Sequence, residues 1–202
     1  MALNLDLNNI LQLISALSPL LVTFLMVMIS MFNLNLKGIV YLAGVLLANF
    51  GNIIVGSTIN HRKYENASIF CNLIDIPYLS NFNVPSSTAV FLSFTTVYLT
   101  LPMIMNGQIN PAIISFFLLL IGIDAITRIS NRCTNVLGVI MGLLFGGIFG
   151  TAWYSLFKYS GNESLLYYEE LQSNRVRCSK PTKQTFKCTV YKNGEMISSD
   201  IA

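Results

Sequence analysis

Charged residues are scarce in this chain: they make up 10% of its 202 residues, while 53% of the residues are hydrophobic. Soluble domains carry about 25% charged residues, so the composition excludes an ordinary soluble domain. The mean hydropathy of +0.61 agrees with this. The net charge of +3 is too small to indicate a nucleic-acid-binding protein. We therefore expect an integral membrane protein whose first partner is the lipid bilayer.

Histidine is almost missing, since His61 is the single histidine, and the four cysteines form no CxxC pair. The ligand spacing of a zinc site is therefore absent. The chain also has no Gly-rich nucleotide-binding loop. We expect no metal ion and no other cofactor.

Five apolar runs are each close to the roughly 20 residues that cross the hydrocarbon core of a bilayer. They predict an all-α fold, a polytopic bundle of about five transmembrane helices within a domain of residues 1–160. The predicted spans are residues 10–32, 38–59, 86–105, 111–127 and 136–157.

The last predicted span carries glycine at every fourth position, at Gly138, Gly142, Gly146 and Gly150. This spacing gives the helix one flat face, and flat faces of small residues let helices pack closely in membranes. We expect the fifth helix to pack tightly through this face.

Residues 161–202 form a polar C-terminal tail, with a short amphipathic helix compatible with residues 163–172. Apolar and polar residues then alternate around Asn193-Gly194, which is typical of a β-hairpin turn. The tail is too small for a large core of its own, so we expect it to bind a protein partner or the membrane surface.

Five spans place the N-terminus and the loops at 60–84 and 128–135 on one side and the tail on the other. Basic residues occur on both sides, so their count does not decide the orientation. Cys71 and Cys133 fall in the loops of the first side, where they can be near each other. Cys178 and Cys188 lie in the tail, where a bridge requires an oxidising compartment.

The stretch NVPSSTAVFLSFTTVYL, residues 83–99, places Pro85, Ser86 and Ser87 directly before an almost uncharged helix. Serine is a good N-cap, and unpaired N–H groups at a helix start attract phosphate. An ordinary cap on an ordinary span is the competing interpretation.

This stretch resembles the PSGH/PSSH segment of the type 2 phosphatidic-acid phosphatase superfamily, especially its dolichyl-diphosphatase branch. TRISNRCTNVLGVIMGLLFGGIFGTAWY, residues 127–154, is similar to the branch's SR-x5-H-x3-D/Q motif and glycine-rich last helix. LAGVLLANFGNIIVGSTINHRKY, residues 42–64, is similar to the region that ends in the K-x6-RP motif. The resemblance covers roughly residues 10–158.

The resemblance also implies that the catalytic residues are lost. Thr88 replaces the general-acid histidine, Thr134 the nucleophilic histidine, and Gly138 the residue that orients the nucleophile. Family members form a phosphohistidine, and a threonine hydroxyl is a poor nucleophile without a base. We therefore expect a catalytically degenerate member rather than an enzyme.

Phosphate-binding positions are better kept. The resemblance makes Lys63, Ser86, Ser87 and Arg128 candidates for holding a phosphate or lipid headgroup. Asp124 precedes Arg128 by four residues on one predicted helix, so the two side chains are expected to pair. Asp124 then either holds Arg128 in place or supplies an internal counter-charge in a site that no longer binds phosphate.

These expectations favour a membrane scaffold or anchor that presents residues 161–202 to a protein partner. A protein that binds lipid or polyprenyl phosphate without hydrolysis, or a residual lipid phosphatase, is the alternative. The expected location is an endoplasmic-reticulum-type membrane or, since frequent Ile and Asn suit an AT-rich genome, the internal membrane of a large DNA virus.

Overall fold

The computed structural model describes residues 7–60, 68, 71, 82–107, 109–167, 187–192 and 195–201. The chain divides into two compact units, Met1–Gln172 and Ser173–Ala202. Lys63, His61 and Cys178 lie outside the described residues.

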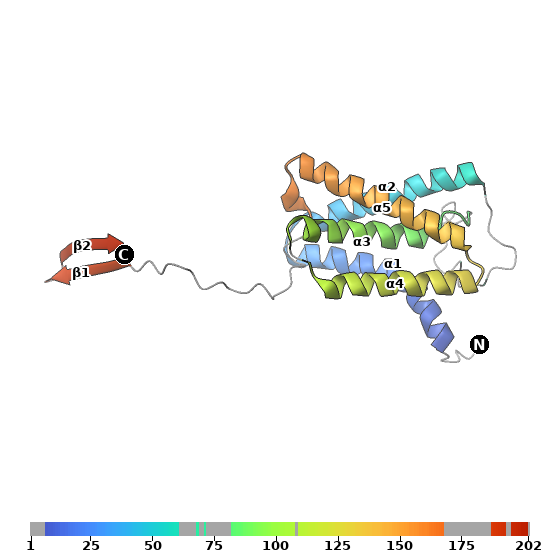
Figure 1. The fold of residues 1–202 in the computed structure, drawn as a ribbon, viewed down its shortest axis with the longest axis horizontal. Helices are drawn as coiled ribbons and strands as arrows, with labels where there is room; N and C mark the ends of the chain where they lie inside the picture. Colours follow the sequence, from blue (N-terminus) through green and yellow to red (C-terminus); the bar gives the residue numbers. More distant parts are fainter. Residues whose placement is uncertain are drawn as a thin grey trace. The chain divides into compact units, whose positions relative to one another are not determined.

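In its described residues, the first unit is a bundle of five long helices (Figure 1). All five are long and apolar enough to cross a membrane, which confirms the prediction of an all-α bundle with five spans. Length and composition thus mark the chain as an integral membrane protein. The helices are α1 (Leu7–Phe32), α2 (Lys37–Ile59), α3 (Ser87–Met105), α4 (Pro111–Ser130) and α5 (Val136–Tyr159).

Local chemistry sets where α4 and α5 begin. The side chain of Asn110 accepts the Ala112 N–H at 3.2 Å, and Pro111 occupies the first helical position of α4. The side chain of Asn135 accepts the Gly138 N–H at 2.6 Å before α5. Asparagine at the cap and proline in the first turn are favoured because helix starts leave N–H groups unpaired.

Helix α3 lies at the centre of the bundle and contacts the four other spans. In its most apolar stretch 61% of the residues are buried, against 17% for α4. Phe94 and Tyr98 stack on α3 with ring centroids 5.9 Å apart, and Tyr41 of α2 packs against both rings. The Tyr41 hydroxyl also lies 2.8 Å from Thr95 Oγ1, so this buried polar group is paired.

The glycine face of α5 packs on α3, as predicted. A Cβ atom added at Gly142 would lie 2.8 Å from the Ser86 carbonyl oxygen, and one added at Gly150 would lie 2.8 Å from the Phe94 carbonyl oxygen. A Cβ atom at Gly146 would collide with the Val90 carbonyl oxygen. The two backbones therefore touch along several turns, an approach that only glycine permits.

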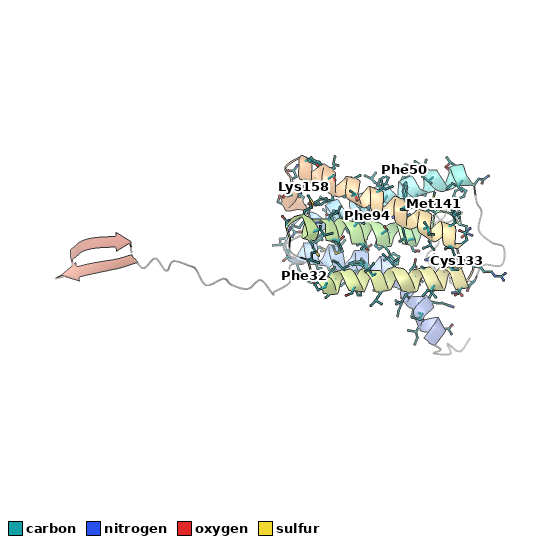
Figure 2. The ribbon with its side chains drawn as sticks, viewed as in Figure 1. Phe32, Phe50, Phe94, Cys133, Met141 and Lys158 are labelled. Carbon is teal, nitrogen blue, oxygen red and sulfur yellow. A yellow bond between two sulfur atoms is a disulfide. The ribbon has the colours of Figure 1, made fainter. Side chains whose placement is uncertain are left out.

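The outer surface of the bundle is apolar. Phe32 and Phe50 are 79% and 62% exposed on the outside, whereas Phe94 is fully buried (Figure 2). A soluble monomer rarely exposes large side chains so widely, whereas lipid chains solvate them, so this surface fits direct contact with the bilayer.

After α5 the chain turns back into the bundle. Residues Glu163–Leu165 form a single 3-10 turn (η2) at the start of the segment 163–172 for which the sequence suggested a short amphipathic helix; residues 168–172 lie outside the described residues. Leu166 and Tyr167 are buried, and the Tyr167 hydroxyl donates to the Met26 carbonyl of α1. The bundle therefore extends past residue 160, because the Tyr167 ring packs in the core rather than continuing a surface helix.

The second unit contains the predicted β-hairpin. Strand β1 (Lys187–Lys192) pairs antiparallel with β2 (Glu195–Ile201), with Lys192 opposite Glu195. The register shifts between Val190 and Tyr191. The strands flank Asn193-Gly194, as the turn chemistry predicts.

The close α3–α5 contact predicts that a methyl group added on the glycine face of α5 lowers the stability of the protein. We expect Gly146→Ala to lower the stability of the purified protein in detergent by about 1–3 kcal/mol, because the methyl group meets backbone that cannot rotate away. Gly122→Ala on α4 is the matched control, since nothing lies within 4 Å of its added Cβ. Thermal unfolding measures both variants, and equal melting temperatures would contradict the close packing.

Candidate functional site

Five of the positions singled out in the sequence meet at one end of the bundle. Helices α3 and α5 begin there and α4 ends there, which places Ser86, Thr88, Arg128, Thr134 and Gly138 at the same level of the bundle. Lys63, the other cationic candidate, lies outside the described residues. We call this end the disulfide end, for the Cys71–Cys133 bridge described below.

The Asp124 carboxylate is the centre of this cluster. It is 2% exposed and accepts three hydrogen bonds from three different helices. Ser15 Oγ of α1 and Arg128 Nε of α4 donate to Oδ1 at 2.7 and 2.9 Å, and Thr88 Oγ1 of α3 donates to Oδ2 at 2.8 Å. The predicted pairing of Asp124 with Arg128 is present. A buried carboxylate is tolerated only with such partners.

Thr134 and Gly138 are held by the backbone beside α3. Thr134 Oγ1 donates to the Asn83 carbonyl at 2.7 Å, and the Ser86 N–H donates to the Gly138 carbonyl at 2.9 Å. A Cβ atom added at Gly138 would lie 2.9 Å from the Asn83 carbonyl oxygen. These positions therefore lock the start of α5 against the segment that enters α3.

The start of α3 differs from what the sequence suggested. Ser86 occupies the N-cap position, but its side chain makes no capping hydrogen bond and its N–H is already bonded to Gly138. Ser87 faces α2 instead, where its Oγ accepts from Asn52 Nδ2 at 3.1 Å. The sequence suggested free N–H groups for phosphate at the start of α3. One of these, the Ser86 N–H, is occupied, because the glycine face of α5 brings the Gly138 carbonyl to it.

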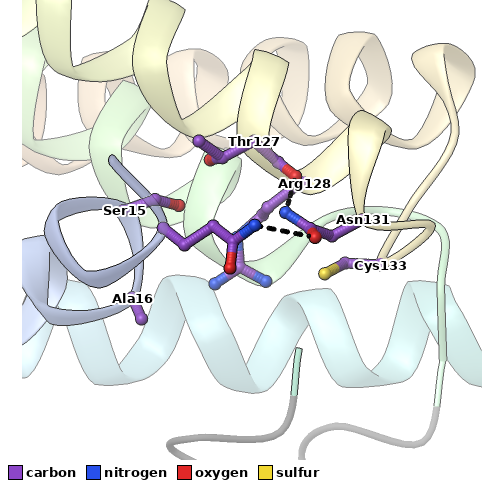
Figure 3. Close-up of a pocket in the computed structure, with 7 residues that line it drawn as sticks. Ser15, Ala16, Thr127, Arg128, Asn131 and Cys133 are labelled. Atoms are coloured by element: carbon purple, nitrogen blue, oxygen red, sulfur yellow. Dashed lines mark hydrogen bonds between the residues drawn. The ribbon is translucent and has the colours of Figure 1, made fainter. Parts of the chain in front are cut away.

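A small hollow adjoins the cluster, between α1 and the end of α4 (Figure 3). Gln12 Nε2 donates to Asn131 Oδ1 at 3.0 Å, and Asn131 Nδ2 donates to the Thr127 carbonyl at 2.7 Å. The hollow is close to the size of one water molecule. Gln12 Oε1 is buried without a hydrogen-bond partner and suits that water. The lining residues are Gln12, Ser15, Ala16, Thr127, Arg128, Asn131 and Cys133.

A disulfide closes this end of the bundle. Cys71, between α2 and α3, is bonded to Cys133 in the α4–α5 turn. The Ser68 N–H donates to the Asn131 carbonyl at 3.3 Å beside it. The sequence placed both cysteines on one side, and the structure confirms that they are near each other. The bridge itself was not predictable, because it depends on how the turns meet.

In the part of the chain that the structure describes, no group of three or more His, Cys, Asp or Glu side chains is arranged to hold a metal ion. The chemistry of the site is that of a carboxylate, a guanidinium, hydroxyl groups and backbone amides.

Comparison with known proteins gives no relative: no family model, no curated protein and no solved structure matches the chain. Fold and site together define a five-span integral membrane bundle with an internally neutralised polar cluster.

The cluster predicts that loss of the Asp124 charge destabilises the bundle. We expect Asp124→Asn to lower stability by about 3 kcal/mol, since it leaves the partly buried Arg128 guanidinium without its counter-charge. The double variant Asp124→Asn/Arg128→Gln should recover part of that loss, because it removes both charges. Thermal unfolding in detergent measures the three proteins, and an unchanged Asp124→Asn protein would contradict the role of the pair.

Proposed function

We propose that the chain is a catalytically inactive protein of the type 2 phosphatidic-acid phosphatase kind that works as a membrane scaffold or anchor. The observation that carries the proposal is the Asp124 carboxylate, which sits among the donors that would otherwise hold a phosphate group. In this proposal, residues 161–202 carry the surface that binds a protein partner.

Both threonines at the degenerate positions are already bonded elsewhere. Thr88 donates its hydroxyl proton to Asp124, and Thr134 donates its own to a backbone carbonyl. Nucleophilic catalysis needs a side chain activated by an adjacent base and directed at the substrate. The Thr134 hydroxyl donates to a carbonyl, which is not a base, and the carboxylate that Thr88 contacts is shared with Ser15 and Arg128. This arrangement supports a pseudoenzyme.

Electrostatics weigh against the alternative of a lipid-phosphate-binding protein. A phosphate brought to Arg128 would approach an ionised carboxylate that already shares the guanidinium. Among the described residues, the partly exposed Arg128 side chain, 19% exposed, favours this alternative.

The scaffold role draws on the second compact unit. Residues Ser173–Ala202 form the second compact unit and include the β1–β2 hairpin. A small two-stranded hairpin is only marginally stable alone, so a partner that adds to it would stabilise it. We place this activity in an endoplasmic-reticulum-type membrane or the internal membrane of a large DNA virus.

Lipid phosphatase activity is the first test. We expect the purified full chain to release no phosphate from phosphatidic acid or a polyprenyl diphosphate above the rate of protein-free detergent micelles. The assay measures inorganic phosphate, with Arg128→Ala beside the native chain. Turnover by the native chain that Arg128→Ala removes would overturn the proposal.

Bound lipid tests the alternative. Mass spectrometry of lipids extracted from the purified chain should find the same anionic phospholipids on the native protein and on Arg128→Ala. A phospholipid present on the native protein and lost in that variant would favour the lipid-phosphate-binding function instead.

Truncation tests the scaffold. A chain ending at Gln172 keeps the whole first unit, including the Tyr167 anchor. We expect it to melt at the same temperature as the full chain and to lose the protein that crosslinks to the full chain in its native membrane. Equal crosslinking of the two chains would contradict the role of the tail.

A further inference from the structure

The two ends of the bundle face opposite sides of the membrane, and the five spans of the described residues, an odd number, put the start of α1 and the end of α5 on opposite sides. The disulfide end carries the start of α1, the segment between α2 and α3, and the α4–α5 turn. The opposite end, which we call the tail end, carries the α1–α2 turn and the end of α5. Residues 173–202 contain no apolar run of span length, so they stay on the side of the tail end.

The disulfide separates the two sides chemically. Cys71 and Cys133 are bonded to each other at the disulfide end. Structural disulfides form and persist in oxidising compartments and are rare in reducing cytosol, where thiols are kept reduced. A bridge that joins two separate turns of a membrane protein therefore marks the side that faces the oxidising compartment.

The basic residues do not oppose this assignment. Close to the spans their number is equal at the two ends, with Arg62, Lys63, Arg128 and Arg132 on the side of the disulfide end, and the further basic residues all belong to the tail. Segments on the cytosolic side of membrane proteins carry an excess of Lys and Arg. The basic residues of the tail end are Lys37, Lys158, Arg175, Arg177, Lys180, Lys183, Lys187 and Lys192.

We propose that the chain spans its membrane with the Cys71–Cys133 end in an oxidising compartment and its tail in the reducing cytosol. Cys178 and Cys188 are then thiols rather than a bridge. Residues 171–192 carry six basic residues and no acidic one, a composition that suits the side of the anionic cytosolic leaflet. The orientation does not rest on the proposed function. If the tail binds a partner, however, that partner is a protein of the cytosolic side.

Thiol labelling of the full chain tests the orientation. The chain is inserted into sealed endoplasmic-reticulum vesicles whose cytosolic face points outward, and a membrane-impermeant polyethylene-glycol maleimide is added. We expect the mass shift of two labelled thiols in intact vesicles. Cys178→Ser and Cys188→Ser should each remove one of the two, which assigns the shifts.

The bridge is tested in the same vesicles. Detergent alone should add no further shift, and detergent with a reductant should add the shifts of Cys71 and Cys133. Cys71→Ser is the matched variant: it frees the Cys133 thiol, which should become labelled only after detergent is added.

Three results would overturn the proposal: tail thiols protected until detergent is added, disulfide-end thiols labelled in intact vesicles, or labelling of Cys71 and Cys133 in detergent without reductant. None of these bears on phosphate release or on crosslinking of the tail. Failure of the orientation is therefore distinguishable from failure of the proposed function.

Discussion

The backbone contact between α3 and α5 is the constraint on which the rest of the structure depends. At Gly142, Gly146 and Gly150 the backbone of α5 packs directly against backbone carbonyl groups of the α3 segment, with no side chain between them. The same packing brings the Gly138 carbonyl to the Ser86 N–H, and this hydrogen bond fixes the position of α3 along the bundle axis. Since lipid chains are as apolar as the side chains, such packing rather than hydrophobic burial is what holds helices together in a bilayer.

With α3 fixed in that position, Thr88 donates to the Asp124 carboxylate, which also accepts from Ser15 and Arg128. The cluster joins α1, α3 and α4 at a level where water is scarce and unpaired polar groups are expensive. Its charges cancel within the chain. The same arrangement that stabilises the bundle leaves little positive potential for an incoming phosphate, which is why stability and loss of binding go together in the function we propose.

The spans, the glycine face and the hairpin were predictable because each depends on the period or composition of one short segment. The Asp124–Arg128 pair was predictable for the same reason, since four residues separate its members on one helix. Ser15 and Thr88 were not predictable as partners of Asp124, because nothing local links them to α4. The disulfide and the buried Tyr167 also depend on how distant segments meet, and helical periodicity carries no information about that.

Tyr167 has a mechanical consequence. Its hydroxyl is bonded to α1 and its ring packs edge-on against Tyr41 of α2, with the centroids 6.5 Å apart. The chain passes through this point after leaving α5 and before entering the tail. A force on the tail is thus borne first by the α1–α2 pair, and the last turn of α5 is shielded from it. Tension on the tail would therefore act on α1 and α2, the first two helices of the chain, before it could unwind the end of α5.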